Sequence, residues 1–154
     1  MRPRVYRIPR PLRGILFHIL QLTWCLPQNI VGGVAALLFR GKRYRYHGSL
    51  VTVYRGEKLA KKLGAFSLSA FIFVPEIWPE NYRRHVVVHE YGHTVQSLIL
   101  GPFYLLAVGL PSVLWANVYC RREPRFKKLG IGYTDRYPEN GADRLGEYFT
   151  GEKP

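Results

Sequence analysis

Acidic side chains are scarce in this sequence. Its 154 residues include 10 Asp and Glu against 23 Lys and Arg, which gives a formal net charge of +13. Any chemistry that needs a carboxylate therefore has only ten candidate residues. The excess of positive charge does not indicate a fold, but it favours an anionic partner: nucleic acid, an acidic membrane surface or an acidic substrate.

Cysteine is also rare. Cys25 and Cys120 are too few for a disulfide framework and too far apart for a CxxC metal site, so we expect two buried thiols. The sequence has no internal repeat and no low-complexity linker. Its apolar content of 47% excludes a disordered tail, a coiled coil and a collagen-like repeat. A chain of this length is expected to form one domain with its own core.

Charged residues are missing altogether from Gly14 to Phe39, between two basic clusters. This run can be a cleaved signal peptide (although no small-x-small site follows it), a single transmembrane helix, a monotopic anchor bent at Pro27, or a pair of core helices. Basic residues on both flanks favour the monotopic anchor, because both ends then meet anionic headgroups. We expect a basic arm, kept irregular by prolines up to Arg13, and an apolar anchor over residues 1–45. One compact unit is expected over residues 46–154.

Two stretches of the chain suit β-strands. The first is Tyr44–Tyr54, with a turn near Gly48, and the second is Gly64–Val74. In the second stretch the apolar residues fall on one face at period two: Phe66, Leu68, Ala70, Ile72 and Val74. Together they predict a short β-hairpin ahead of the next helix. That helix begins at Pro79-Glu80 and is expected to end at Leu100, before Gly101-Pro102.

The middle of this apolar helix contains His89-Glu90-Tyr91-Gly92-His93, an HExxH motif. Residues four apart lie on the same helix face, so both imidazoles can reach one Zn²⁺. Glu90 is rotated by about 100° from His89, which lets it touch a metal-bound water. Gly92 lets another element pack closely. Two structural histidines are the alternative, but unpaired polar groups in an apolar helix are costly, which favours a metal site.

The third ligand must come from the short list of acids. His85 is two turns from His93, so it cannot join both histidines at one ion and is expected on the helix surface or behind a ligand. Most acids suit ordinary roles at strand and helix ends, in a neighbouring ion pair or in the C-terminal tail: Glu57, Glu76, Glu80, Glu123, Glu147 and Glu152. Asp135, Glu139 and Asp143 remain.

The segment Glu139-Asn140-Gly141-Ala142-Asp143 is the most informative of these. If helical, it places Glu139 and Asp143 one turn apart on the same face. Glu139 can then ligate the metal, while Asp143 accepts the outer N–H of a histidine ligand, expected to be His89. The small side chain of Ala142 would let this helix approach the HExxH helix closely.

These two segments resemble the HExxH and ExxAD motifs of gluzincin zinc metallopeptidases, a group that includes membrane-associated CAAX-prenyl and heat-shock peptidases and the minigluzincins. The resemblance covers ten residues and the helix around the first motif. It implies a helix-dominated, zincin-like α+β fold, Zn²⁺ bound by His89, His93 and Glu139, base Glu90, and Asp143 behind a ligand. Two departures are the short chain and Gly141, which weakens a helix by about 1 kcal/mol relative to Ala. Intramembrane site-2 proteases share an HExGH form, but their Asp-Gly segment is not found here.

A shared metal also restricts the topology. Leu98–Cys120 carries no charge, yet a single membrane crossing would separate His93 from Glu139 by about 30 Å. The run must therefore turn back, and we expect turns at Gly101-Pro102 and at Gly109-Leu110-Pro111. These would leave two short apolar arms, Phe103–Val108 and Ser112–Tyr119. Aromatic and basic residues in and after the arms suit a membrane interface: Tyr104, Trp115, Tyr119 and the run Arg121–Lys128.

The sequence thus favours a membrane-associated zinc metallopeptidase in which Glu90 activates a metal-bound water for peptide-bond hydrolysis. Its partners would be a peptide or protein substrate and an anionic membrane surface. The segment Phe66–Val74 is a candidate for edge pairing with substrate, and Tyr133 or Tyr137 for donation to the oxyanion. The alternative is a non-catalytic membrane- or nucleic-acid-binding protein with a structural metal. Nucleic acid is disfavoured because the basic runs lie beside apolar segments.

Overall fold

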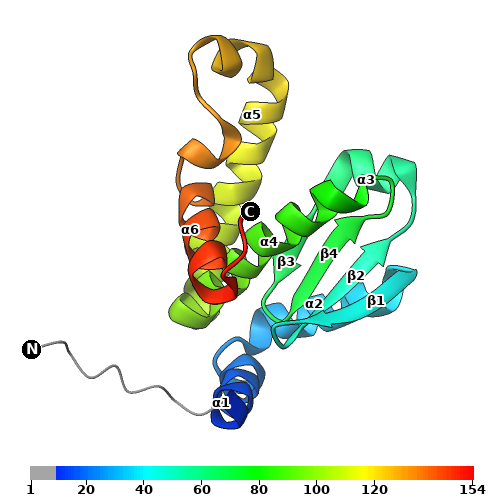
Figure 1. Cartoon of the computed structure of the whole chain (residues 1–154), viewed down its shortest axis with the longest axis vertical. Helices are drawn as coiled ribbons and strands as arrows, with labels where there is room; N and C mark the ends of the chain where they lie inside the picture. The colour runs from blue at the N-terminus through cyan, green and yellow to red at the C-terminus, as the bar shows by residue number, and fades with distance from the viewer. Residues whose placement is uncertain (1–9) are drawn as a thin grey trace, which may run out of the picture.

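Two short hairpins form a four-stranded mixed sheet in the computed structural model, which describes residues 10–154. β1 (Gly41–Tyr46) and β2 (Ser49–Tyr54) are antiparallel, as are β3 (Phe66–Leu68) and β4 (Phe71–Pro75). The hairpins join where β2 runs parallel to β4, which gives the order β1-β2-β4-β3 (Figure 1). A helix that the sequence pattern did not predict, α3 (Glu57–Leu63), leads from β2 to β3.

The single strand expected over Gly64–Val74 is wrong. The chain turns back at Ser69, whose φ of 56° lies in the left-handed region. Phe66 therefore pairs with Phe73 and stacks on its ring, on the face opposite to Ile72. β4 buries apolar side chains on both faces, so it has an apolar residue at every position. The alternating apolar residues of β3 therefore continue into β4 without a break, and the sequence pattern does not show the turn.

The long helix α4 (Glu80–Leu100) has the bounds predicted from the sequence, and it ends at Gly101, where φ is +55°. Apolar residues of α4 pack on one face of the sheet in a cluster formed by Val51, Val53, Ile72, Val74, Val87, Tyr91 and Val95. The other face packs against α2 (Leu26–Leu38) and α3 through Ala36, Tyr54, Ala60 and Phe73. The sheet is thus a middle layer in a helix-rich α+β fold (Figure 1).

Helix α6 (Glu139–Thr150) packs along α4 at very short range. A Cβ atom on Gly92 would lie 1.8 Å from the Ala142 carbonyl oxygen, and one on Gly146 would lie 2.3 Å from that of Val88. The predicted helical form of the Glu139–Asp143 segment and the close approach at Gly92 and Ala142 are confirmed. Gly146 is a third small residue at this contact that the sequence reasoning did not single out.

The N-terminal apolar run forms two helices, α1 (Arg10–Thr23) and α2. They are separated at Trp24-Cys25, and Pro27 lies inside the first turn of α2, where its missing N–H costs nothing. The arm expected to be irregular up to Arg13 is already helical from Arg10, and residues 1–9 lie outside the described part. The expected boundary between residues 45 and 46 falls within β1. In residues 10–154, no helix combines the length and the apolar character required to cross a membrane.

The second apolar run contains one of the two expected turns. After α4 come a 3-10 turn, η1 (Gly101–Phe103), a π-helical turn, η2 (Leu105–Gly109), and then α5 (Leu110–Lys128). The turn expected at Gly109-Leu110-Pro111 is absent, so the two predicted arms are one continuous helical segment. Pro111 offers no N–H to the carbonyl of Ala107, which instead accepts a hydrogen bond from the Tyr137 hydroxyl.

Side chains in this segment also correct two expectations. Tyr104 and Tyr119 are buried in the protein, and Trp115 donates to the carbonyl of Tyr133 at 2.8 Å, so these rings pack inward. Cys25 is buried as expected, but Cys120 is exposed on α5. The chain returns to α4 through a short 3-10 turn, η3 (Tyr133–Asp135), which leads into α6.

Candidate metal centre

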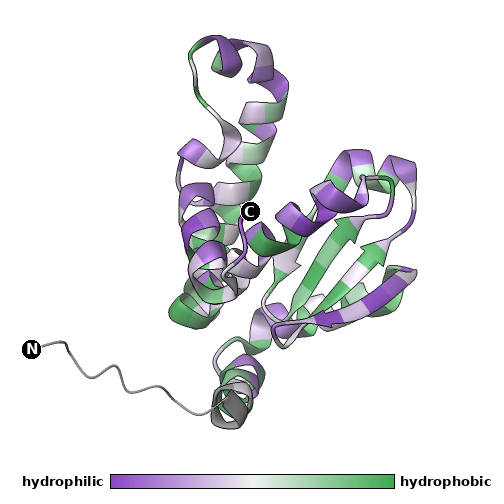
Figure 2. Ribbon diagram, in the orientation of Figure 1, coloured by the Kyte–Doolittle hydropathy of each residue, from purple (hydrophilic) through white to green (hydrophobic). Residues whose placement is uncertain are grey.

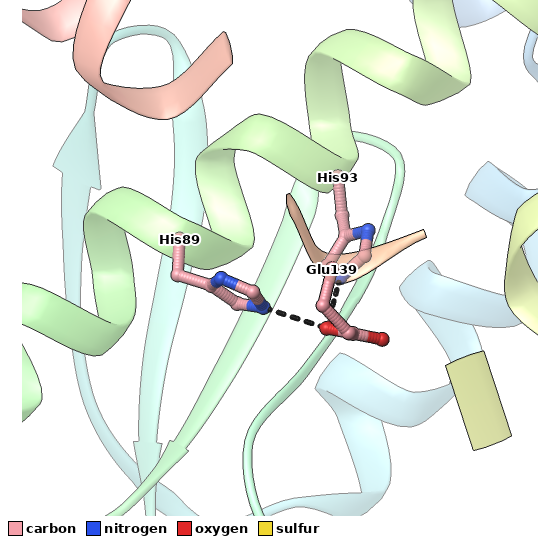
Figure 3. A group of neighbouring side chains, drawn as sticks. All are labelled: His89, His93 and Glu139. Carbon is pink, nitrogen blue, oxygen red and sulfur yellow. Dashed lines mark hydrogen bonds and ion pairs between the residues drawn. The ribbon is translucent and has the colours of Figure 1, made fainter. Parts of the chain in front are cut away.

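Three side chains from two helices meet at the contact between α4 and α6. His89 and His93 lie one turn apart on α4, and Glu139 is the first residue of α6. One ligand atom from each lies within 4.8 Å of the others (Figure 3). The Oε2 atom of Glu139 is 3.0 Å from His89 Nε2 and 3.3 Å from His93 Nε2. The residues predicted as metal ligands are therefore brought together, in a group that can hold a metal ion.

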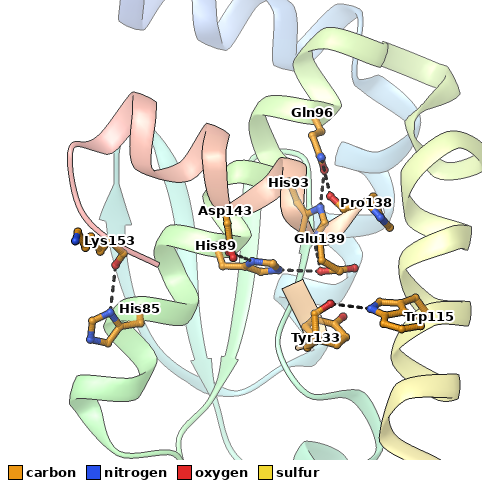
Figure 4. Close-up of polar contacts among 10 residues, drawn as sticks. All are labelled: His85, His89, His93, Gln96, Trp115, Tyr133, Pro138, Glu139, Asp143 and Lys153. Carbon is orange, nitrogen blue, oxygen red and sulfur yellow. Dashed lines mark hydrogen bonds and ion pairs between the residues drawn. The ribbon is translucent and has the colours of Figure 1, made fainter. Parts of the chain in front are cut away.

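The Nδ1 atom of each imidazole, which faces away from Glu139, lies next to a side-chain oxygen that can accept a hydrogen bond (Figure 4). His89 Nδ1 lies 2.6 Å from Asp143 Oδ1, which is the contact predicted from the sequence. His93 Nδ1 lies 2.7 Å from Gln96 Oε1. Because carboxylate and amide oxygens are acceptors, both Nδ1 atoms donate, and a neutral ring then directs the lone pair of Nε2 towards the centre of the group.

Gln96 is a site residue that the sequence reasoning missed. Its amide nitrogen donates to the Pro138 carbonyl at 3.1 Å, which fixes the amide so that its oxygen faces His93. The contact links the residue directly before Glu139 to a candidate ligand on α4. The sequence could have indicated Gln96 only by its position, three residues after His93 and on the same face of a buried helix. Gly141 leaves room for this amide, since a Cβ there would lie 2.8 Å from Gln96 Nε2.

This arrangement of acceptors requires a cation. Two neutral rings would present lone pairs to the same carboxylate oxygen, and a proton or a metal ion relieves that repulsion. For the protein without metal, burial lowers the pKa of His89, but hydrogen bonds to Asp143 and Glu139 and the charge of Glu90 raise it to about 10. Burial acts to raise the pKa of Glu139, but hydrogen bonds from His89 and His93 hold it below its usual range.

The second carboxylate oxygen of Glu139 provides a further test of fit. Oε1 is fully buried and has no hydrogen-bond partner among the described residues. A buried carboxylate oxygen normally has such a partner, and an oxygen left without one costs free energy. Two oriented imidazoles and a carboxylate with an unused oxygen together match the ligand set of a divalent metal ion.

Glu90 lies next to the ligands in the sequence and is itself buried. Burial raises the pKa of its carboxyl above the ordinary value, while the nearby His93 and His89 act in the opposite direction. Burial raises the pKa of Tyr104, and the charge of the nearby Glu90 carboxylate raises it further. The carboxyl of Glu90 is thus buried near the metal-binding group.

The two tyrosines proposed as oxyanion donors have different surroundings. The Tyr133 ring centroid lies 6.5 Å from that of His89, and after burial the Glu139 charge is the main cause of its raised pKa. Figure 4 places Tyr133 beside the centre, where Trp115 holds its carbonyl. Tyr137 instead donates to Ala107. Of the two, Tyr133 is therefore the tyrosine that lies beside the candidate metal centre.

The remaining candidates do not belong to the group of His89, His93 and Glu139. His85 is exposed, and its Nδ1 lies 3.2 Å from the Lys153 carbonyl oxygen (Figure 4). Glu123 pairs with Lys127 at 2.7 Å, as predicted, and Asp135 accepts from the Gly132 N–H at 2.6 Å. Other acids pair with basic neighbours: Glu57 with Lys61, Glu76 with Arg55, and Glu80 with Arg84.

Comparison of this chain with protein-family models, with curated proteins and with solved structures found no match. The functional conclusion therefore depends on the residues of the centre and their geometry.

Proposed function

We propose that this protein is a zinc-dependent hydrolase of peptide bonds. The observation that carries the proposal is the buried group of His89, His93 and Glu139, in which the outer nitrogens of both rings are held by acceptors. Two histidines and one glutamate leave a coordination position open, which is typical of catalytic zinc sites. Structural zinc sites instead close all four positions with protein ligands, most of them cysteines, and the two cysteines of this chain do not lie in the group.

Zinc, when bound, would supply a Lewis acid that polarises a carbonyl and lowers the pKa of a coordinated water. Glu90 would accept the proton of the attacking water and later donate it to the leaving amine. Burial favours this double role, because a carboxyl with a raised pKa is a stronger base for the water proton and can still return that proton near neutral pH. Asp143 and Gln96 would keep the two rings oriented throughout.

Substrate recognition would involve the free edge of the sheet. β3 is the last strand in the order β1-β2-β4-β3, and it packs against α4, which carries the histidines. An extended peptide can add to such an edge through main-chain hydrogen bonds. The segment predicted to pair with substrate, Phe66–Val74, contains both β3 and β4. Only β3 has an unpaired edge, because β4 lies between β2 and β3. Tyr133 would donate to the carbonyl oxygen of the bond being cleaved.

The proposal is tested by metal analysis and peptide hydrolysis on the full chain. We expect about one zinc per chain in both wild type and Glu90→Gln, with cleavage of labelled casein or of a quenched-fluorescence peptide library only by wild type. His85→Ala is the matched control, since that exposed histidine on the same helix should affect neither measurement. Wild type without zinc would overturn the metal centre. Wild type that binds zinc and cleaves none of the substrates would overturn the hydrolase and leave a structural metal.

A further inference from the structure

The N-terminal helices have an inverted distribution of polarity. Gln21 and Gln28 face the protein interior with exposed fractions of 1% and 0%, and Asn29 is also buried. Leu22 and Leu37, in contrast, are 68% and 80% exposed. Helices on a water-facing surface place polar residues outside and apolar residues inside. The outer faces of α1 and α2 therefore match an apolar environment.

The buried amides attach these helices firmly to the elements that carry the metal centre. Gln28 Nε2 donates to the Ser97 hydroxyl at 3.1 Å and to the Gly101 carbonyl at 2.7 Å, at the C-terminal end of α4. Asn29 accepts a hydrogen bond from the Ala70 N–H at 3.1 Å, in the turn between β3 and β4. Each buried amide thus makes hydrogen bonds to specific partners, although Gln21 Nε2 and Gln28 Oε1 have none among the described residues. These bonds join the inner faces of α1 and α2 to the rest of the fold, so the apolar side chains of both helices are on the outer face.

The exposed apolar side chains continue beyond α1 and α2. Trp24 packs on Gly101, so that a Cβ at this glycine would lie 2.2 Å from its ring. Next to this contact, Phe103 and Leu106 expose their side chains from the segment that follows α4. In Figure 1 these elements lie at the lower end of the view, and Figure 2 shows hydrophobic residues on them. We call this surface of α1, α2 and residues 103–106 the apolar end. Scattered exposed apolar residues are normal, but a continuous surface of this extent marks an interaction site.

The charge beside the apolar end selects its partner. The first 56 residues contain ten Lys and Arg and no Asp or Glu. Arg40, Lys42 and Arg43 are exposed directly after α2, at the start of β1. A second copy of this chain would bring the same uncompensated positive charge to the interface, which is repulsive. Anionic lipid headgroups attract such residues and also offer an apolar layer beneath them.

We propose that the apolar end docks into the surface of an anionic lipid bilayer. α1 and α2, with 14 and 13 residues, are each about 20 Å long, so they fit in the plane of the interface with their exposed leucines in the acyl region. The basic residues after α2 then contact the headgroups. This docking is independent of hydrolysis and needs no metal ion.

Vesicle co-sedimentation of the full chain tests this proposal. We expect wild type to bind vesicles that contain phosphatidylglycerol at least about tenfold more tightly than vesicles of phosphatidylcholine alone, and high salt to weaken binding. Leu37→Glu should weaken binding at least about tenfold, because it places a charge in the acyl layer. Leu63→Glu is the matched control: Leu63 is an exposed leucine on α3, outside the apolar end, and this variant should bind as wild type does.

Several results would overturn the docking. These are a wild type that stays in the supernatant with both kinds of vesicle, a Leu37→Glu variant that binds as tightly as Leu63→Glu, and a concentration-dependent dimer without vesicle binding. Thermal unfolding of each variant checks the fold, and the high exposure of Leu37 predicts an unchanged melting temperature. Zinc content and peptide hydrolysis are measured separately, so failure of the proposed hydrolase and failure of docking give different results.

Discussion

Asp143 Oδ1 lies 2.6 Å from Nδ1 of His89, on the side of the ring away from the Nε2 atom that faces Glu139. The carboxylate therefore selects the tautomer in which Nε2 has a free lone pair. Asp143→Ala removes this acceptor. We expect zinc affinity to fall by about 10- to 100-fold, which is typical when the hydrogen-bond partner of a histidine ligand is lost. Asp143→Asn keeps an acceptor oxygen, so its loss should be smaller.

Competition with a fluorescent zinc chelator measures these affinities. Glu147→Ala is the control, because Glu147 lies one turn further along α6 and is exposed. Equal affinities for wild type and Asp143→Ala would show that Asp143 does not orient a ligand.

Gly92→Ala tests the close contact between α4 and α6. The added methyl would lie 1.8 Å from the Ala142 carbonyl oxygen, which is backbone and cannot move aside alone. We expect a loss of at least about 2 kcal/mol in the free energy of unfolding, together with weaker zinc binding as the helices separate. Urea denaturation measures the first effect. Gly14→Ala in α1 has open space around it and should change stability by no more than about 1 kcal/mol, in the stabilising direction. Similar losses in both variants would contradict the contact.

The stability of the metal-free protein should depend on pH through His89. Its pKa is raised from about 6.5 in the unfolded chain to about 10 in the fold. A raised folded pKa contributes stability that is complete below about pH 6.5 and is lost as pH rises towards 10. We expect chelator-treated wild type to lose a few kcal/mol of unfolding free energy over this interval. Asp143→Ala removes the largest contribution that raises this pKa, the hydrogen bond to Asp143, so this variant should lose less stability over the same interval. Parallel curves for the two proteins would refute the assignment.

Tyr133→Phe and Tyr137→Phe form a matched pair at the catalytic step. Tyr133 lies beside His89, whereas the Tyr137 hydroxyl is engaged by the Ala107 carbonyl. If Tyr133 stabilises the oxyanion, its removal should lower kcat by about 100-fold or more while zinc content is unchanged. Tyr137→Phe should retain the wild-type kcat. Steady-state kinetics with one cleavable peptide distinguish the two variants, and an unchanged kcat for Tyr133→Phe would remove this residue from the mechanism.

Local helix periodicity explains why so much of the centre could be predicted. The spacing of His89 and His93, and that of Glu139 and Asp143, depends only on residues four apart sharing a helix face. Small residues at the contact between the helices add a second local signal, as at Gly92 and Ala142. Gln96 obeys the same periodicity, but a buried glutamine has no chemical signature until its partners are known.

Features that depend on tertiary partners could not be predicted in the same way. The sequence does not show the turn at Ser69 because β3 and β4 carry similar apolar residues. Pro111 predicts a turn from the sequence, but the helix continues through it, and the Tyr137 hydroxyl donates to the Ala107 carbonyl that this proline leaves without a partner. The inward orientation of Gln21 and Gln28 depends on acceptors and donors in distant segments. A charge-free run therefore indicated an apolar surface, but not which helix faces form it.

Membrane docking and the proposed hydrolase together predict a preference among substrates. Cys25 and Gln28 contact Ser97, which lies one turn after His93 on α4, so the metal centre is held close to the apolar end. A cleavable peptide attached to a lipid should then be hydrolysed faster on anionic vesicles than the same peptide free in solution, because both molecules are concentrated at one surface. We expect at least about a tenfold difference in initial rate at equal bulk concentration. Leu37→Glu should abolish this difference while leaving hydrolysis of the free peptide unchanged. A wild type that cleaves both peptides equally on vesicles to which it binds would show that docking does not present the substrate to the metal centre.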